Sequence, residues 1–128
     1  GYGHPTRASR DLLVSILPLD QLLEQQGLSR VDFVKIDVEG AETQVLLGMS
    51  ALLERSPDVL LIVEFCPSAQ EASGVDPVEV WRILSRVGFT IRAIDHSLEG
   101  VLLPTESAAA TLATQLREDG YRNLLCWR

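Results

Sequence analysis

Basic residues, cysteine and histidine are all scarce in this sequence. Its 128 residues contain 11 Lys and Arg against 18 Asp and Glu, a formal net charge of −7. Such an acidic chain is a poor candidate for binding a nucleic-acid backbone or an anionic membrane surface. The two cysteines, Cys66 and Cys126, lie far apart in apolar runs. We therefore predict buried thiols in a reducing compartment, the cytoplasm, and no disulfide framework.

Long apolar runs are also missing. No stretch is long enough to span a bilayer, and no basic segment followed by an apolar one marks the N-terminus as a leader. Hydrophobic residues still make up 46% of the chain, which is enough for a core. We expect one partial domain over residues 1–128, in which residues 1–12 are loop or disordered.

Apolar β-branched runs alternate with helical patterns along the chain. The pattern predicts strands at 14–17, 31–38, 59–65, 89–94 and 121–127. It predicts helices at 19–26, 41–55, 76–88 and 107–118, and loops at 68–75 and 95–106. This alternation is typical of an α/β fold with a mainly parallel sheet, helices on both faces and successive strands side by side.

Acidic residues follow two of these strands, where α/β sheets commonly bind ligands. Strand alternation places Lys35, Asp37 and Glu39 on one side of the first strand, and Glu64 ends the next. One interpretation is a structural ion pair between Lys35 and Asp37 or Glu39, with Glu42 favouring the start of a helix. The alternative is a carboxylate cluster that binds a substrate hydroxyl or a divalent ion.

The same segment carries a family resemblance. Residues 31–42, VDFVKIDVEGAE, resemble the DxxKIDVEGxE signature of FkbM-type methyltransferases. Further elements of that family appear in the same order across residues 14–95: LDQLL at 19–23, VLLGM at 45–49, the strand at 57–64 that ends in glutamate, and Gly88-Phe89.

This resemblance implies a partial Rossmann-like class I methyltransferase sheet, the C-terminal half of the domain. Such enzymes transfer a methyl group from S-adenosylmethionine, usually to a hydroxyl of a sugar, polyketide or other secondary metabolite. The family's glycine-rich cofactor motif is not found in the sequence, so its cofactor-binding residues stay unassigned. We expect the full-length parent to use S-adenosylmethionine and the isolated chain to be inactive.

Within the resemblance, Asp37, Glu64 and Glu39 are the candidate catalytic residues. Lys35, Glu42 and His96 are the candidate substrate-binding residues. Asp37 and Glu64 are also the candidate ligands of a divalent metal. The expected partner is a small hydroxyl-bearing acceptor, with no nucleic acid and no membrane.

Two other functions remain open at this point. The chain could be a non-catalytic α/β interaction module that self-associates as a homodimer through an exposed sheet edge. A phosphodiesterase fragment is a third reading, but the sequence offers few of the acids and phosphate-binding loops it would need.

Overall fold

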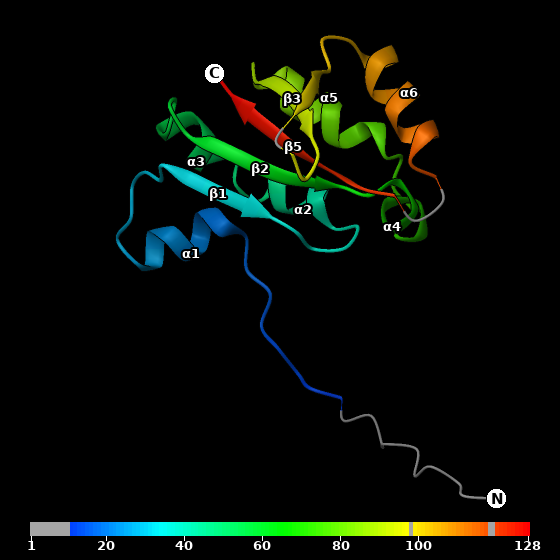
Figure 1. The fold of residues 1–128 in the computed structure, drawn as a ribbon. Coiled ribbons are helices and arrows are strands. Elements are labelled where there is room, and N and C mark those ends of the chain that lie inside the picture. Colours follow the sequence, from blue (N-terminus) through cyan, green and yellow to red (C-terminus); the bar gives the residue numbers. More distant parts are fainter. Residues whose placement is uncertain (1–10, 98, 118–119) are drawn as a thin grey trace, which may run out of the picture.

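Five strands form one mixed sheet in the order β1-β2-β5-β3-β4 (Figure 1). The computed structural model describes residues 11–97, 99–117 and 120–128. The strands are β1 (Phe33–Ile36), β2 (Leu60–Phe65), β3 (Thr90–Ile94), β4 (Gly100–Leu102) and β5 (Arg122–Trp127). An α/β fold is therefore confirmed.

The sheet is mostly antiparallel, so the predicted mainly parallel sheet is wrong. Only β1 and β2 pair in parallel, whereas β5 pairs antiparallel with both β2 and β3, and β4 pairs antiparallel with β3. The last strand enters between β2 and β3 because Leu124 and Cys126 are wholly apolar positions with no exposed surface. Two flanking strands bury them better than a place at the edge of the sheet would.

Six helices accompany the sheet in the described part of the chain. They are α1 (Leu19–Gln25), α2 (Glu42–Leu47), α3 (Ser50–Arg55), α4 (Pro67–Ala72), α5 (Val78–Arg86) and α6 (Glu106–Gln115). None of them is long and apolar enough to cross a membrane. The predicted helices at 19–26, 76–88 and 107–118 correspond to α1, α5 and α6.

Four local predictions are wrong. The helix expected over 41–55 is broken at Gly48 and Met49 into α2 and α3. The loop expected at 68–75 contains α4, where Pro67 supplies a favourable first helical position. The loop expected at 95–106 contains β4, and residues 14–17 form no strand because they find no partner strand.

The two faces of the sheet differ sharply. One face, which we call the packed face, carries apolar side chains that join the helices in the core: Ile36, Leu61, Val63, Phe65, Ile91, Ala93, Leu124 and Cys126. In Figure 1 the helices α2, α3 and α5 lie behind the sheet, on this face. Helices were expected on both faces, and this expectation is wrong for the described residues.

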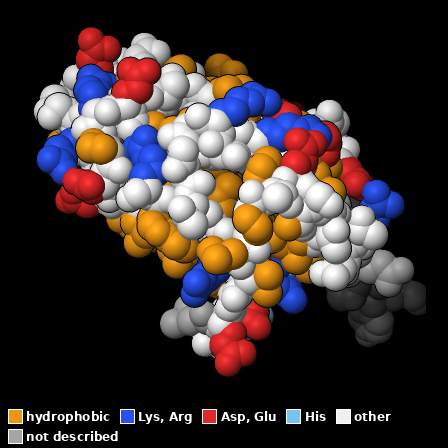
Figure 2. Space-filling model, turned by 90° about the horizontal axis from the view of Figure 1, so that it is seen from above, with side chains coloured by type: hydrophobic (Ala, Val, Ile, Leu, Met, Phe, Trp, Pro, Cys, Tyr) orange, Lys and Arg blue, Asp and Glu red, His pale blue; other side chains and the backbone are white. Residues whose placement is uncertain are grey.

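The opposite face, which we call the open face, carries the alternate residues of each strand. They include Phe33, Lys35, Leu60, Ile62, Glu64, Asn123, Leu125, Trp127 and Arg92. None of these side chains belongs to the hydrophobic core cluster, and Phe33 remains 50% exposed. Figure 2, which views the molecule from above, shows hydrophobic groups at the surface between charged ones.

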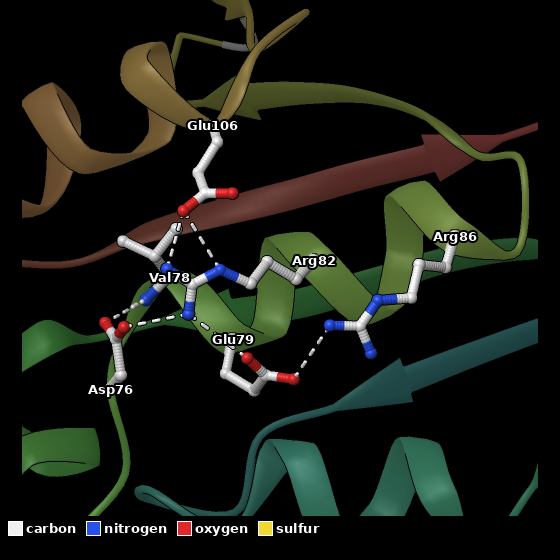
Figure 3. Close-up of polar contacts among 6 residues, drawn as sticks. All are labelled: Asp76, Val78, Glu79, Arg82, Arg86 and Glu106. Carbon is white, nitrogen blue, oxygen red and sulfur yellow. Dashed lines mark hydrogen bonds and ion pairs between the residues drawn. The ribbon is translucent and has the colours of Figure 1, made fainter.

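An ion-pair network joins α5 to the start of α6 (Figure 3). The guanidinium of Arg82 donates to Glu106 over 2.6 Å, to Asp76 over 2.9 Å and to Glu79 over 3.2 Å. The hydrogen bond from Arg82 lowers the pKa of both Asp76 and Glu106. The network thus links α5 to the first residue of α6.

Both cysteines are free thiols. Cys126 is fully buried, and burial raises the pKa of its thiol to about 12. Cys66 is only half-buried, so the prediction of two buried thiols is confirmed for Cys126 alone.

Candidate functional site

The parallel pairing of β1 with β2 brings Asp37 and Glu64 together. The register pairs Ile36 with Val63, so the next residue of each strand lies beside the other at the same sheet edge. The carboxyl of Glu64 is in hydrogen-bonding contact with Asp37. Lys35 precedes Asp37 by two residues and Glu64 follows Ile62 by two, so both acids stand on the open face.

The environment of Glu64 favours its protonated form. Burial contributes most, the hydrogen bond with Asp37 comes next, and the negative charges of Asp37, Glu42 and Glu39 add to both. Together they raise the pKa of Glu64 from about 4.5 to about 7. A carboxyl with a pKa close to neutral can accept and return a proton at physiological pH, as a general base or acid does.

Lys35 lies on the same side of β1 as Asp37, as strand alternation predicts. Its ammonium nitrogen is 3.7 Å from Asp37 Oδ2, and both side chains are about half exposed, at 57% and 44%. An exposed pair of this kind contributes at most about 1 kcal/mol to stability. The structure thus places Lys35 beside the acidic pair, where it compensates part of the negative charge.

The turn after β1 folds around the carboxylate of Glu42. Glu39 and Gly40 both have positive φ angles, 50° and 104°, which pull the chain back on itself. The amides of Val38 and Gly40 then donate to Glu42 Oε1 over 3.3 and 3.2 Å. Glu42 is fully buried, so it organises the turn and has no surface with which to meet a substrate.

Glu39 is exposed at the top of this turn. A left-handed conformation is uncommon for a residue with a side chain, and it costs about 1–2 kcal/mol. The turn holds Glu39 close enough to Glu64 for its charge to raise the pKa of that group. Glu39 therefore lies next to the acidic pair, as its assignment as a candidate catalytic residue requires.

Helix α4 packs against the turn, although the sequence pattern predicted a loop there. Gln70 is fully buried and donates its side-chain amide to Glu42 Oε2 over 3.2 Å. A side chain at Gly40 would meet the backbone of Ala69 and the hydroxyl of Ser73. The helix signal of Pro67 followed by good helix formers was the only clue that α4 would form here.

His96 lies away from the acidic pair. It follows β3, which is separated from β2 by β5, and its exposed ring meets Tyr121 edge-on at 6.3 Å. The structure therefore does not bring His96 to Asp37 and Glu64.

The described residues add no third ligand of the usual kinds to Asp37 and Glu64, the candidate ligands of a divalent metal. Over residues 11–97, 99–117 and 120–128, no three or more His, Cys, Asp or Glu side chains are grouped to hold a metal ion. Lys35 beside Asp37 also supplies a positive charge where a cation would bind.

The fold and the site together define an α/β domain with paired acids at the carboxyl ends of two adjacent parallel strands. Residues 4–91 match the methyltransferase FkbM domain family, and the chain belongs to this family. The match lies over the N-terminal part of the chain and ends within β3. The expectation that residues 1–128 form the C-terminal half of the domain therefore needs correction, because β4, α6 and β5 lie outside the match.

Two curated proteins are similar to the chain. It is 29% identical over 82 residues to the hexuronic acid methyltransferase AglP of Haloferax volcanii, covering 64% of this chain and 31% of that protein. It is 37% identical over 84 residues to the AMB antimetabolite synthetase AmbE of Pseudomonas aeruginosa, covering 64% of this chain and 4% of that protein. The chain thus spans less than a third of the length of either relative. No solved structure matches it.

Proposed function

We propose that the chain forms the acceptor side of an S-adenosylmethionine-dependent O-methyltransferase. The contact between Asp37 and Glu64 at the ends of two parallel strands carries this proposal. Membership of the FkbM family supports methyl transfer as the reaction, and the relative named as a hexuronic acid methyltransferase supports a sugar as acceptor. The free thiols are compatible with a cytoplasmic location.

The described residues do not offer a cradle for the cofactor. The amides of Val38 and Gly40, the most obvious anion-binding groups near the site, are already taken by Glu42. No glycine-rich turn between a strand and a helix accompanies them within the described ranges. The cofactor, whose sulfonium supplies the methyl group when bound, must be held by other residues.

On the acceptor side, Glu64 takes the proton of the attacking hydroxyl. An acceptor oxygen freed of its proton in this way would be ready to receive the methyl group that the bound cofactor would supply. Asp37 accepts a hydrogen bond from the acceptor and fixes its direction, since in-line attack requires an aligned oxygen. Glu39 and Lys35 adjust the local charge beside the acidic pair.

The test compares methyl transfer by the protein that carries this domain with transfer by its Glu64→Gln and Asp37→Asn variants. Radiolabelled S-adenosylmethionine is supplied with a hexuronic acid glycoside or with a neutral hexose glycoside. We expect a loss of roughly 10²-fold or more in kcat for Glu64→Gln, the usual range for a general base. Glu54→Gln, an exposed change on α3, is the matched control. Unchanged turnover in both site variants would overturn the proposal.

A non-catalytic interaction module is the second candidate function. It is favoured by the position of β1 at the edge of the sheet, where Phe33 is half exposed. This function would leave the acidic pair without a task, and for this reason it ranks second.

A further inference from the structure

Asn123 stands beside Glu64 on the open face. It is the second residue of β5, and the antiparallel register pairs it directly with Glu64 on one side and with Ile94 on the other. Directly paired residues of antiparallel strands point to the same face, with Cβ atoms about 4.5–5.5 Å apart. Asn123 on β5 is therefore next in line after Asp37, which directly follows β1, and Glu64 on β2.

The side chain of Asn123 is available to a ligand. It is only partly buried, and it makes no hydrogen bond to another residue in the part of the chain that the structure describes. Asn123 also lies outside residues 4–91, so the family match does not assign it a role.

We infer that Asn123 is a further substrate-binding residue of the site and that the acceptor is a neutral sugar with neighbouring hydroxyl groups. This inference rests on the proposed function. An ionised carboxylate only accepts hydrogen bonds, whereas an Asn amide both donates and accepts, so Asn123 adds a donor to the row that suits the hydroxyls of a sugar. The row from Asp37 to Asn123 crosses two strand spacings, about 10 Å, which a sugar ring with its hydroxyls can follow.

Apolar surface adjoins the row. Leu125 follows Asn123 by two residues on the same face, and the register pairs it with Ile62. Both side chains are partly exposed, and neither belongs to the hydrophobic core cluster. The carbon-bound hydrogens of a sugar ring can pack on such a surface while its hydroxyls face the polar row.

The local charge disfavours an acidic sugar. Asp37, Glu39 and Glu42 all raise the pKa of Glu64, which shows how much negative charge is concentrated here. The ammonium of Lys35 offsets the negative charge of Asp37, whose Oδ2 lies 3.7 Å from its Nζ. A further carboxylate on the acceptor would add repulsion, so the site should select an uncharged hexose over a hexuronic acid.

Nuclear magnetic resonance of the ¹⁵N-labelled full chain tests this inference without requiring turnover. Methyl β-D-glucopyranoside and methyl β-D-glucuronide are titrated separately while the side-chain amide signals of Asn123 are followed. We expect saturable shifts of these signals with the glucoside and binding of the glucuronide at least about fivefold weaker. Asn123→Ala should weaken glucoside binding by roughly three- to tenfold, the usual worth of a hydrogen bond.

Thr90→Ala is the matched control, because Thr90 is an exposed residue on the open face at the far end of β3. It should leave glucoside binding unchanged, and Asn123→Ser provides a second variant that keeps a polar group if the alanine variant folds poorly. Unmoved Asn123 signals, or glucuronide binding as tight as glucoside binding, would overturn the inference. If methyl transfer takes place but the Asn123 amide signals do not move, only this inference is overturned. If the sugar binds but no methyl group is transferred, only the proposed catalysis is overturned.

Discussion

Gln70 donates its side-chain amide to the carboxylate of Glu42 over 3.2 Å, and neither residue has any exposed surface. The two residues are 28 positions apart, so this bond joins α4 to the turn that follows β1. Since the same carboxylate also binds the amides of Val38 and Gly40, one buried group determines where the chain goes after Asp37.

Replacing Glu42 by Gln should therefore destabilise the fold. The new amide group has almost the same shape, and it can still bond to Gln70 if the Gln70 amide turns over, because Gln70 Oε1 has no partner among the described residues. The amides of Val38 and Gly40 would then donate to a neutral oxygen instead of a charged one. Hydrogen bonds to charged groups contribute about 1.5–3 kcal/mol and neutral ones about 0.5–1.5 kcal/mol, so we expect a loss of about 2 kcal/mol in the free energy of unfolding. Urea denaturation measures it, with the exposed Glu54→Gln as control. A Glu42→Gln variant as stable as this control would contradict the role given to Glu42.

Gly40 should tolerate alanine much less well than Gly74 does. Both have positive φ angles, 104° and 78°, so both substitutions strain the backbone. Only at Gly40 would the new Cβ also meet the backbone of α4, whereas at Gly74 it would find open space. We expect Gly40→Ala to cost at least about 1 kcal/mol more than Gly74→Ala, because overpacking adds to backbone strain. Equal losses in urea denaturation would show that α4 does not press on the turn.

The aspartate of the LDQLL element, Asp20, has a structural role away from the acidic pair. Its carboxylate accepts hydrogen bonds from the amides of Ala51 and Leu52, both over 2.8 Å, and so caps α3 from α1. Asp20→Ala should lower the free energy of unfolding by about 1–2 kcal/mol, as the loss of a cap does. Glu24→Ala, on the exposed side of α1, is the control and should change it by less than about 0.5 kcal/mol. Similar thermal or urea midpoints for the two variants would argue against capping.

Much of the local structure was predictable from the sequence. The strands β1 and β2 follow from β-branched apolar runs, and the start of α5 follows from Asp76 and Pro77. The contact of Asp37 with Glu64 was also predictable, since parallel neighbours end at the same edge. These features depend on residues close together in sequence, or on a pairing of successive strands.

The rest depends on contacts between distant segments. Nothing near residues 122–127 indicates that this strand enters between β2 and β3, because that choice is made by burial of Leu124 and Cys126. Glu42 was predicted to be a substrate-binding residue, but in the structure it is fully buried and accepts a hydrogen bond from Gln70 of the distant helix α4. The open face was not predicted either, because β2 reads as an apolar run typical of a strand covered on both faces.

The raised pKa of Glu64 has a consequence for stability. The pKa of Glu64 is about 7 in the native state and about 4.5 in the unfolded chain. Between these two pH values Glu64 keeps its proton in the native protein, whereas the unfolded chain releases it. Its stabilising contribution is present at low pH and is lost as the pH rises through 7. Glu64→Gln cannot titrate, so its stability relative to the wild type should increase from pH 5 to pH 8. Urea denaturation at each pH measures this difference, in which the titrating groups that do not contact Glu64 cancel, and a constant difference would contradict the raised pKa.

The free edge of β1 makes self-association of the isolated chain testable. In the described part of the chain β1 has a partner strand on one side only, and Phe33 on its open face is 50% exposed. In the segment that precedes α1, which has no regular structure, Leu12 and Ile16 are 82% and 89% exposed. An unpaired strand edge and exposed apolar side chains both favour association with a second copy, so we expect a concentration-dependent homodimer in sedimentation velocity. Phe33→Lys should weaken it by placing a charge at that edge, whereas Thr90→Lys, on a strand with neighbours on both sides, should not. A monomer at all concentrations, or equal effects of the two lysines, would show that β1 is not the interface.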